Sequence, residues 1–343
     1  MTTWVGMTAL LLLLTACGNS APGAARETLA TGTFESFSYT NAAGTRTYKV
    51  YTPASYTGAP APLLVDLHGC SSNADEEARW SRFNELAEDY GLLVAYPEQS
   101  SAANGSRCWN WFIEEHYHRD AGEPSLIAGI TREVMAGWNV DAGRVYIAGI
   151  SAGGAMVNIM VAAYPDLYAA AMSYAGCHYT GFCFGTASPV PAATAGQSMH
   201  TEMGPRARVV PVLVLQGDQD ELVLYPNADI VVQTFLAADD LADDGVDNGS
   251  IPRARSATRS GQVPGGHAYD IDDYTDGDGC LLAQRWLIHG MKHAWSTPNG
   301  NGSARDVALT DPLGPDLSTP TFDFLLSYEL GNNSQQPCRS YAP

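Results

Sequence analysis

Apolar runs alternate with segments of helical periodicity along most of the chain. Six runs predict β-strands, and several are continuous, as expected of strands that are covered on both faces. They are YKVYTP near residue 48, PLLVDLHG near 62, LLVAYP near 92, RVYIAG near 144, AAMSYAG near 170 and VPVLVLQG near 210. Three segments predict helices, namely EEARWSRFNELAEDYG, SLIAGITREVMAGW and AMVNIMVAAYP. The alternation predicts an α/β fold with a mostly parallel central sheet and helices on both faces.

The N-terminus departs from this pattern. Its apolar run, residues 5–14, is too short to span a bilayer as a mature helix and has the length of a signal-peptide core. We therefore interpret residues 1–17 as a signal peptide. The segment LTAC, residues 14–17, also resembles a bacterial lipobox, in which the cysteine carries lipid after cleavage. The chain is thus expected to be secreted, or to be a cell-envelope lipoprotein anchored to the membrane through Cys17.

The chain after the N-terminal segment is predicted to contain one domain. A chain of 343 residues fits one large α/β domain or two small ones, and no linker-like composition or repeat interrupts it between about residues 30 and 330. We interpret residues 18–30 as a flexible leader, residues 31–332 as a single domain and residues 333–343 as a C-terminal tail.

The charge and the cysteines narrow the possible functions. A formal charge of −19 with only two lysines repels nucleic acid, so we exclude DNA and RNA as partners. Six cysteines remain besides Cys17, and an even number in an exported chain indicates disulfides. Sequence alone leaves their pairing open: Cys70, Cys108, Cys177, Cys183, Cys280 and Cys338. None of their spacings resembles a zinc site, and no metal is expected.

The stretch Gly149-Ile150-Ser151-Ala152-Gly153 places a serine between a strand-like run and a helical segment. The two glycines leave room for a sharp strand-to-helix turn with the serine oxygen at its tip, which is how a serine is presented as a nucleophile. The N–H of Ala152 would then face a developing oxyanion at a helix N-terminus, where the dipole favours negative charge. The alternative is a glycine-rich turn without chemistry.

A serine nucleophile needs a base and a group that orients the base. In α/β-hydrolases the acid and then the histidine follow the serine in the sequence. The acid is expected after a later strand, where VLVLQGDQDELV offers Asp218 and Asp220. We favour Asp220, because G-x-x-D-x-x-V is the usual form of this loop. LIHGMKHAWS offers His289 and His293, and His267 lies upstream. We favour His293, which falls in the loop after a strand-like run, whereas His289 ends that run.

A second oxyanion donor is expected from the loop after an early strand. VDLHGCSSN supplies His68, Gly69 and Cys70 at that place. We predict that the backbone N–H of Cys70 is the donor and that His68 shapes the loop.

Further motifs accompany these residues, and together they resemble the polyhydroxybutyrate (PHB) depolymerase family of secreted esterases, which is related to feruloyl and acetylxylan esterases. The resemblance extends from about residue 33 to residue 330. The matching stretches are LHGC at 67–70, YPEQ at 96–99, CWNWF at 108–112, GE at 122–123, RVYIAGISAGGAM at 144–156, YP at 164–165, GDQDELV at 217–223, NGS at 248–250, HAW at 293–295 and DPLGPD at 311–316.

The resemblance implies an α/β-hydrolase fold in which residues 31–332 form the catalytic domain. It also implies a catalytic triad and an oxyanion hole of two backbone N–H groups, with two tryptophans nearby. In this sequence the triad would be Ser151, Asp220 and His293, the N–H groups those of Cys70 and Ala152, and the tryptophans Trp109 and Trp111.

These residues suggest a serine esterase that hydrolyses short-chain polyhydroxyalkanoate polyesters or their oligomers through an acyl-enzyme. One alternative is a feruloyl or acetylxylan esterase acting on plant polysaccharide, and another is an inactive hydrolase-fold protein that only binds. Trp109, Trp111 and Trp295 are candidates for an apolar substrate platform, or else pack in the core. The chemistry requires no metal or organic cofactor. We expect a monomer whose partner is an ester-bearing polymer.

Overall fold

The six predicted strands form the middle of a ten-stranded sheet. The computed structural model describes residues 32–297 and 303–331, together with Met1. The predicted signal peptide and leader, apart from Met1, and the predicted C-terminal tail fall outside the described residues.

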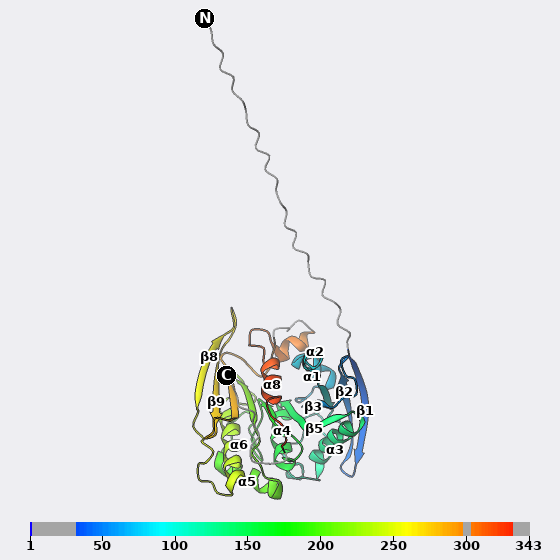
Figure 1. Cartoon of the computed structure of the whole chain (residues 1–343), viewed down its shortest axis with the longest axis vertical. Helices are drawn as coiled ribbons and strands as arrows, with labels where there is room; N and C mark the ends of the chain where they lie inside the picture. Colours follow the sequence, from blue (N-terminus) through cyan, green and yellow to red (C-terminus); the bar gives the residue numbers. More distant parts are fainter. Residues whose placement is uncertain (2–31, 298–302, 332–343) are drawn as a thin grey trace. The chain divides into compact units, whose positions relative to one another are not determined.

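Six neighbouring strands of the sheet run parallel. The strand order is β1-β2-β4-β3-β5-β6-β7-β10-β9-β8 (Figure 1), and every neighbouring pair from β4 to β10 is parallel. Antiparallel strands complete both edges. The strands are β1 Thr33–Asn41, β2 Gly44–Thr52, β3 Ala61–Leu67, β4 Leu93–Pro97, β5 Val140–Ile150, β6 Ala171–Tyr174, β7 Val212–Gly217, β8 Ala257–Gln262, β9 Ala268–Thr275 and β10 Leu281–Ile288.

Helices cover both faces of this sheet. On one face α3, α4, α5 and α6 contact one another in a row, and on the other α1, α2 and α8 pack together (Figure 1). The predicted α/β class with a mostly parallel sheet is therefore confirmed. The helices are α1 Ala74–Ser81, α2 Phe83–Tyr90, α3 Gly122–Gly137, α4 Ala152–Ala163, α5 Ala192–Met203, α6 Pro226–Asp244, α7 Ala304–Leu309 and α8 Ser318–Leu325, with short 3₁₀ turns at Glu114–His116 and Gly204–Arg206. A separate two-stranded sheet joins β11 Trp295–Ser296 to β12 Thr310–Asp311.

The predicted helix over residues 76–91 is divided into two. α1 ends at Ser81 and α2 begins at Phe83. Arg82 between them has a φ of 57°, in the left-handed region that interrupts a right-handed helix. Both halves keep apolar residues at helical spacing, so periodicity alone does not reveal the break.

Two apolar cores lie on the two faces of the sheet. β3 is buried along its whole length, and its alternate side chains enter opposite cores, with Leu63 and Val65 in one and Leu64 in the other. Every residue of α4 is buried. Because α4 has no exposed face, its first turn is held tightly against the ends of β3 and β5.

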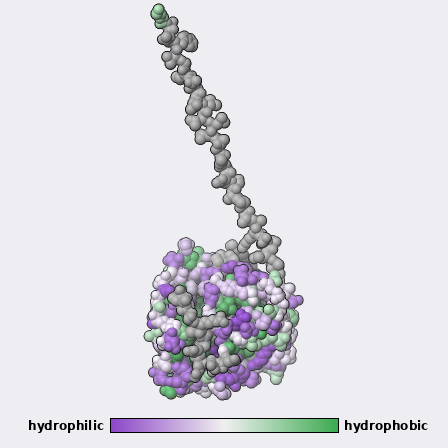
Figure 2. Space-filling model, viewed as in Figure 1, coloured by the Kyte–Doolittle hydropathy of each residue, from purple (hydrophilic) through white to green (hydrophobic). Residues whose placement is uncertain are grey.

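The visible face of the molecule in Figure 2 is mostly polar, with apolar residues in smaller areas between. This agrees with a chain that has a formal charge of −19. Among the described residues, no helix has both the length and the apolar character needed to cross a membrane.

The start of α4 packs directly against the end of β3. A Cβ atom at Gly153 would lie 1.9 Å from the carbonyl oxygen of Leu67, and a Cβ at Gly149 would lie 2.7 Å from the same oxygen. Both distances are far shorter than a van der Waals contact. Only glycine at these two positions allows the strand and the helix to approach so closely.

We predict that Gly153→Ala destabilises the protein by about 3 kcal/mol or more, because the added methyl group overlaps a backbone oxygen that cannot rotate away. Gly137→Ala is the matched control, since a Cβ at this last residue of α3 meets no atom within 4 Å. The control is expected to keep or slightly raise stability. Denaturant unfolding of both variants tests this, and equal stabilities would contradict the prediction.

Candidate active site

Loops that follow parallel strands meet at one edge of the sheet. The loops after β3, β5, β7 and β10 carry, in that order, Cys70, Ser151, Asp220 and His293. Neighbouring parallel strands end at the same edge, so residues far apart in the sequence come together there. Cys70, Ser151 and His293 line one pocket with a volume of about 500 Å³.

Ser151 lies in a strained turn between β5 and α4. Its φ is 59° and its ψ is −120°, a backbone conformation that a non-glycine residue adopts only when the surrounding structure imposes it. Its N–H donates to the carbonyl of Tyr174 at 2.8 Å, and its carbonyl accepts from the N–H of Ala155 at 2.9 Å. These two bonds and the glycine contacts described above hold the turn, which leaves the side chain of Ser151 at the pocket.

Asp220 holds the imidazole of His293. The distance from His293 Nδ1 to Asp220 Oδ2 is 2.6 Å. The other carboxyl oxygen accepts from the N–H groups of Leu222 at 2.8 Å and Val223 at 2.9 Å, and Gln216 donates to Oδ2 at 3.0 Å. A carboxyl group held by these donors fixes the orientation of the ring, so Nδ1 donates to Asp220 and Nε2 is left as the nitrogen that can accept a proton.

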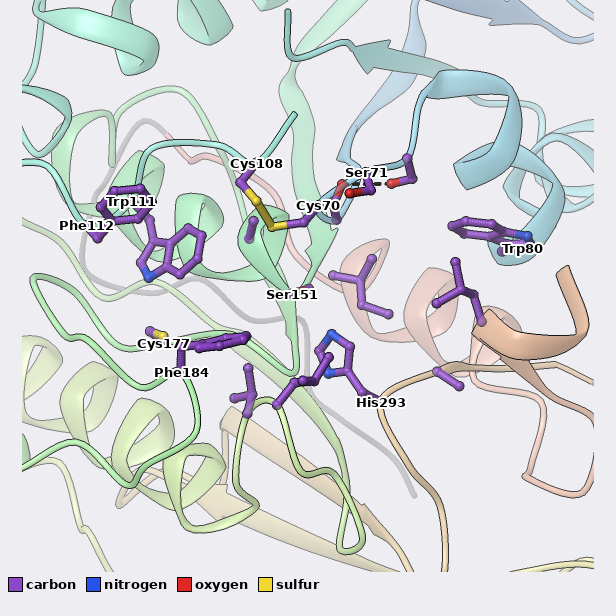
Figure 3. Close-up of a pocket in the computed structure, with 18 of the residues that line it drawn as sticks. Cys70, Ser71, Trp80, Cys108, Trp111, Phe112, Ser151, Cys177, Phe184 and His293 are labelled. Atoms are coloured by element: carbon purple, nitrogen blue, oxygen red, sulfur yellow. Dashed lines mark hydrogen bonds between the residues drawn. A yellow bond between two sulfur atoms is a disulfide. The ribbon is translucent and has the colours of Figure 1, made fainter. Parts of the chain in front are cut away.

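Figure 3 shows the pocket with Ser151 and His293 at its centre. Trp111, Phe112 and Phe184 lie on one side of them, and Trp80 lies on the other. The pocket therefore extends in two directions from the serine. An imidazole held by a carboxylate beside a hydroxyl can take the hydroxyl proton, which is the requirement for a serine nucleophile. Within the described residues, no cluster of three or more His, Cys, Asp or Glu side chains is placed to hold a metal ion.

The side chain of His68 holds the loop after β3 through hydrogen bonds. Gln99 N–H donates to His68 Nε2 at 3.0 Å, so the other ring nitrogen, Nδ1, carries the hydrogen and donates to the carbonyl of Gly69 at 2.7 Å. Burial lowers the pKa of His68, which keeps the ring neutral. The hydroxyl of Ser72 donates to the same carbonyl at 2.7 Å. In a trans peptide the next N–H points the opposite way, so the Cys70 N–H is directed away from these donors.

The two predicted oxyanion donors both belong to residues that line the pocket. Cys70 follows Gly69, where an added Cβ would lie 3.3 Å from the Cβ of Ser151, so this loop passes directly against the serine. Ala152 is the first residue of α4, and its N–H has no partner within the helix. A small anion between the two N–H groups would meet the positive end of the helix dipole.

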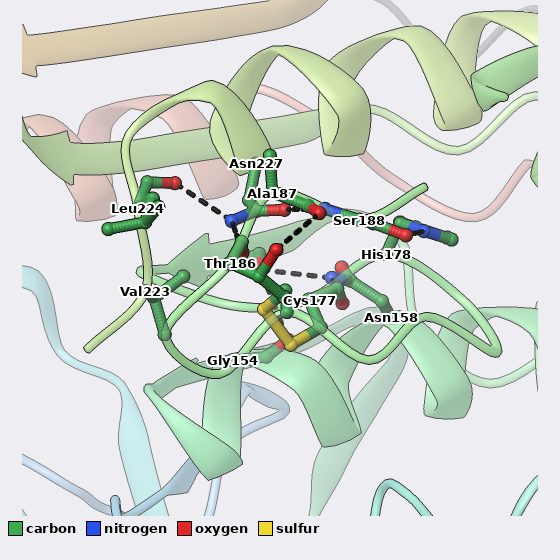
Figure 4. Close-up of a disulfide and its surroundings, with 12 residues drawn as sticks. Gly154, Asn158, Cys177, His178, Thr186, Ala187, Ser188, Val223, Leu224 and Asn227 are labelled. Atoms are coloured by element: carbon green, nitrogen blue, oxygen red, sulfur yellow. Dashed lines mark hydrogen bonds between the residues drawn. A yellow bond between two sulfur atoms is a disulfide. The ribbon is translucent and has the colours of Figure 1, made fainter. Parts of the chain in front are cut away.

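Two disulfides tie the loops that border the pocket. Cys70 is bonded to Cys108, which joins the loop after β3 to the loop after β4. Cys177 is bonded to Cys183 in the loop after β6 (Figure 4). In the second loop, Asn158 of α4 also donates to the carbonyl of Cys177 at 2.7 Å. These two pairings were left open by the sequence.

The loop after β6 supplies aromatic side chains that sequence reasoning missed. Phe182 and Phe184 line the pocket, although each is 54% exposed. Phe184 pairs with Val223, and Gly185 N–H donates to the carbonyl of Leu222 at 2.7 Å. The aromatic side of the pocket is therefore attached to the loop that carries Asp220. The only sequence signal was the pair of phenylalanines flanking Cys183, which is too common a pattern to be diagnostic.

The three predicted substrate tryptophans lie in different surroundings. Trp111 lines the pocket, as expected of a residue that contacts substrate. Trp109 and Trp295 do not line it and are 0% and 1% exposed, which agrees with the packing alternative and not with a substrate platform. The ring centroids of Trp109 and His68 are 5.7 Å apart, and Trp295 packs against Phe83 and Tyr174. Their physical role is packing beneath the pocket.

Asp218 and His289, the alternative candidates for the acid and the base, contact each other. His289 Nδ1 lies 3.0 Å from Asp218 and its Nε2 lies 3.0 Å from Asp270. Both ring nitrogens are thus occupied, and neither His289 nor Asp218 lines the pocket. His267 contacts Asp311 at 3.0 Å and also lies outside the pocket lining. Of the acids and bases weighed from the sequence, the structure joins Asp220 to His293, and His293 lines the pocket.

Comparison with known proteins places these features in a family. The family model described as "Esterase PHB depolymerase" matches residues 46–259. A poly(3-hydroxyalkanoate) depolymerase C of Paucimonas lemoignei is 29% identical over 256 residues, which are 71% of this chain and 58% of that protein. Feruloyl esterase B of Neurospora crassa is 35% identical over 142 residues, 41% of this chain and 47% of that protein. The chain thus spans about half the length of these relatives.

Among solved structures, an acetyl xylan esterase from Aspergillus awamori superimposes with a TM-score of 0.60 at 19% identity. The match covers 76% of this chain and 94% of that one. At this identity the likeness concerns the fold, and it confirms the predicted α/β-hydrolase fold.

The contacts of His289 predict how it titrates. The hydrogen bond to Asp218 raises the pKa of His289 above its ordinary value, against the opposite effect of partial burial, and Asp270 adds to the increase. The charged ring therefore contributes stability at low pH that is lost as the pH rises through the folded-state pKa. We expect Asp218→Asn to lower this pKa in an NMR titration, with the signal assigned from His289→Gln. An unchanged pKa would show that the pair does not form in solution.

Proposed function

The chain belongs to the esterase PHB depolymerase family, and from that premise we propose that it is a serine esterase that hydrolyses esters of short-chain hydroxyalkanoates. The observation that carries the proposal is the 2.6 Å contact of Asp220 with His293, which lines the same pocket as Ser151. We propose residues 31–332 as the catalytic domain, and the family match at 46–259 lies within it.

The proposed reaction is a two-step acyl transfer. His293 Nε2 removes the hydroxyl proton of Ser151 as its oxygen attacks the ester carbonyl, and the carbonyl electrons move to the oxygen. The N–H groups of Cys70 and Ala152 stabilise this oxyanion, each contributing on the order of 10²–10³ to turnover. His293 then gives its proton to the departing alcohol, and water repeats the cycle on the acyl-enzyme. Asp220 keeps the ring oriented and stabilises its charged form.

The substrate proposal depends on the pocket and on the relatives. The Paucimonas lemoignei depolymerase matches 71% of this chain, against 41% for the Neurospora crassa feruloyl esterase. The apolar side of the pocket, with Trp111, Phe112 and Phe184, has room for an acyl group larger than acetyl. A feruloyl or acetylxylan esterase is the second candidate, supported by the higher identity of those relatives over their shorter matches.

We further propose that the protein works outside the cytoplasm. The support is the pair of disulfides that border the pocket, since such bonds persist in oxidising compartments. The expected partner is an ester-bearing polymer or oligomer, bound by a monomer.

The triad proposal predicts that Ser151→Ala abolishes hydrolysis of p-nitrophenyl butyrate while leaving the circular dichroism spectrum and melting temperature close to wild type. Asp220→Asn is expected to lower kcat by about 10⁴, because the imidazole adopts the wrong tautomer. Asp218→Asn is the matched control and is expected to keep wild-type activity, since Asp218 contacts His289 instead. Loss of activity in the control alone would contradict the assignment of the acid. A wild-type protein without activity on any ester would favour the binding-only alternative.

The aromatic side of the pocket predicts a chain-length effect. Phe184→Ala removes apolar contact area, so kcat/KM on p-nitrophenyl octanoate is expected to fall about tenfold, with little change on p-nitrophenyl acetate. Tyr225→Ala is the control, because Tyr225 is exposed but does not line the pocket.

Clearing of a PHB suspension, measured beside ferulate and acetate release from xylan, separates the two substrate candidates. Exclusive release of ferulate or acetate would contradict the polyester proposal.

A further inference from the structure

The pocket has a second wall to which the proposed function gives no role. Trp80 of α1 and Leu309 of α7 line the pocket, and these two residues are called the second wall below. Trp80 lies on the side of Ser151 opposite to Trp111 and Phe184 (Figure 3). Since the wall joins two helices that are far apart in the sequence, its shape depends on how α7 is held against α1.

Polar contacts attach α7 to α1. Across Ala304–Leu309, all of which the structure describes, no residue is buried, so apolar packing contributes little to the position of α7. Asp306 accepts from the indole N–H of Trp80 at 2.7 Å and from Arg79 at 2.9 Å. These bonds, that from Trp80 first, hold the pKa of Asp306 well below its usual range. The carboxylate is therefore ionised at neutral pH, and a charge-assisted bond fixes the ring of Trp80.

Arg305 provides a second attachment. Its Nε donates to Glu76 of α1 at 2.7 Å, and its Nη2 donates to the carbonyl of Ser71. The guanidinium carbon of Arg305 also lies 5.9 Å from the ring centroid of Trp80, within the range of a cation–π contact. Ser71 directly follows Cys70, the proposed oxyanion donor. Residues of α7 thus contact both the second wall and the loop after β3.

The side-chain donors on this side of the pocket are engaged within the protein. The indole N–H of Trp80 is taken by Asp306. The hydroxyls of Ser71 and Ser72 donate to backbone carbonyls at 3.3 Å and 2.7 Å. A sugar that leaves water needs hydrogen bonds in return, whereas Trp80 and Leu309 offer apolar contact area. The second wall therefore suits an alkyl chain better than a sugar.

An ester bound at Ser151 has two arms that diverge from its carbonyl carbon. With the carbonyl oxygen between the two proposed N–H donors, the acyl arm and the alcohol arm leave in different directions. The proposed function gives the aromatic side of the pocket to the acyl arm. The alcohol arm then extends along the second wall.

We propose that Trp80 and Leu309 are specificity-determining residues for the alcohol part of the ester, and that Asp306 is a positioning residue for Trp80. The alcohol is one with an alkyl chain, such as a second hydroxyalkanoate unit. This proposal rests on the proposed function, because it names the part of the substrate that the other half of the same pocket binds.

The first test uses butyrate esters that differ only in the alcohol, with acid release followed in a pH-stat. In Trp80→Ala the ratio of kcat/KM on hexyl butyrate to that on methyl butyrate is expected to fall about tenfold. Leu309→Ala should lower the ratio as well, and Leu309 is partly exposed, so this variant does not threaten the fold. The ratio of p-nitrophenyl octanoate to p-nitrophenyl acetate should stay at the wild-type value in both, because these two esters share one alcohol.

The positioning role is tested at Asp306, which does not line the pocket. Asp306→Ala should lower the hexyl-to-methyl ratio as Trp80→Ala does. Asp306→Asn should restore part of it, because the amide oxygen can still accept from the indole. Asp323→Ala is the matched control: Asp323 accepts from Tyr90 at 2.7 Å, and neither residue lines the pocket. This control should keep the wild-type ratio.

The second test does not depend on hydrolysis. The indole N–H signal of Trp80 in an NMR spectrum can be assigned by its loss in Trp80→Phe. It should move upfield in Asp306→Ala, where the bond to the carboxylate is absent, and stay in place in Asp323→Ala. In Ser151→Ala, which is expected not to turn over ester, addition of a linear 3-hydroxybutyrate trimer should shift this signal, and xylobiose at the same concentration should leave it unchanged.

The outcomes separate this proposal from the proposed function. An indole signal that ignores Asp306→Ala would overturn the positioning role. An altered octanoate-to-acetate ratio with a wild-type hexyl-to-methyl ratio in Trp80→Ala and Leu309→Ala would overturn the assignment of the alcohol arm. A shift caused by xylobiose and not by the trimer would overturn the alkyl alcohol. Absence of hydrolysis of every ester by wild type would contradict the proposed function, and the trimer titration would still decide whether the second wall binds an alkyl ester.

Discussion

The close approach of α4 to the end of β3 is the contact on which the rest of the site depends. With no side chain at Gly153, the helix backbone lies against the carbonyl oxygen of Leu67. This proximity sets the length of the turn that joins β5 to α4, and with it the strained backbone of Ser151. It also brings Gly69 against the serine. Ser151 and the loop that carries Cys70 are therefore positioned by one packing contact.

The loops around the pocket are linked to one another as well as to the sheet. Asp220 orders the imidazole of His293 through one carboxyl oxygen and holds the backbone of Leu222 and Val223 through the other. Val223 in turn pairs with Phe184 in the aromatic side of the pocket. The residue that we propose to orient the base thus also supports the aromatic side of the pocket. If the proposed roles are right, substrate preference and chemical reactivity are coupled through this loop.

Residues that directly follow a strand could be placed from the sequence. Residues whose surroundings depend on contacts with remote parts of the chain could not. Ser151, Asp220 and His293 could be placed because each follows a strand of a parallel sheet, and such strands end at one edge. β1 and β8 were not predicted, because their residues are largely exposed and polar. Trp109 and Trp295 could not be assigned to the core, since burial depends on neighbours such as Phe83 and Tyr174 that are remote in the sequence. Ser72 was missed for the same reason, because its bond to the Gly69 carbonyl has no periodic signature.

The two disulfides make the structure of the pocket depend on the redox state of the chain. One joins the loop bearing Cys70 to the loop bearing Trp111, and the other closes the loop bearing Phe182 and Phe184. Before these bonds form, these loops are held in place only by their non-covalent contacts. A reduced chain would thus have less firmly held pocket borders. For laboratory production, the same reasoning favours expression in an oxidising compartment, such as the periplasm, over refolding from a reduced state.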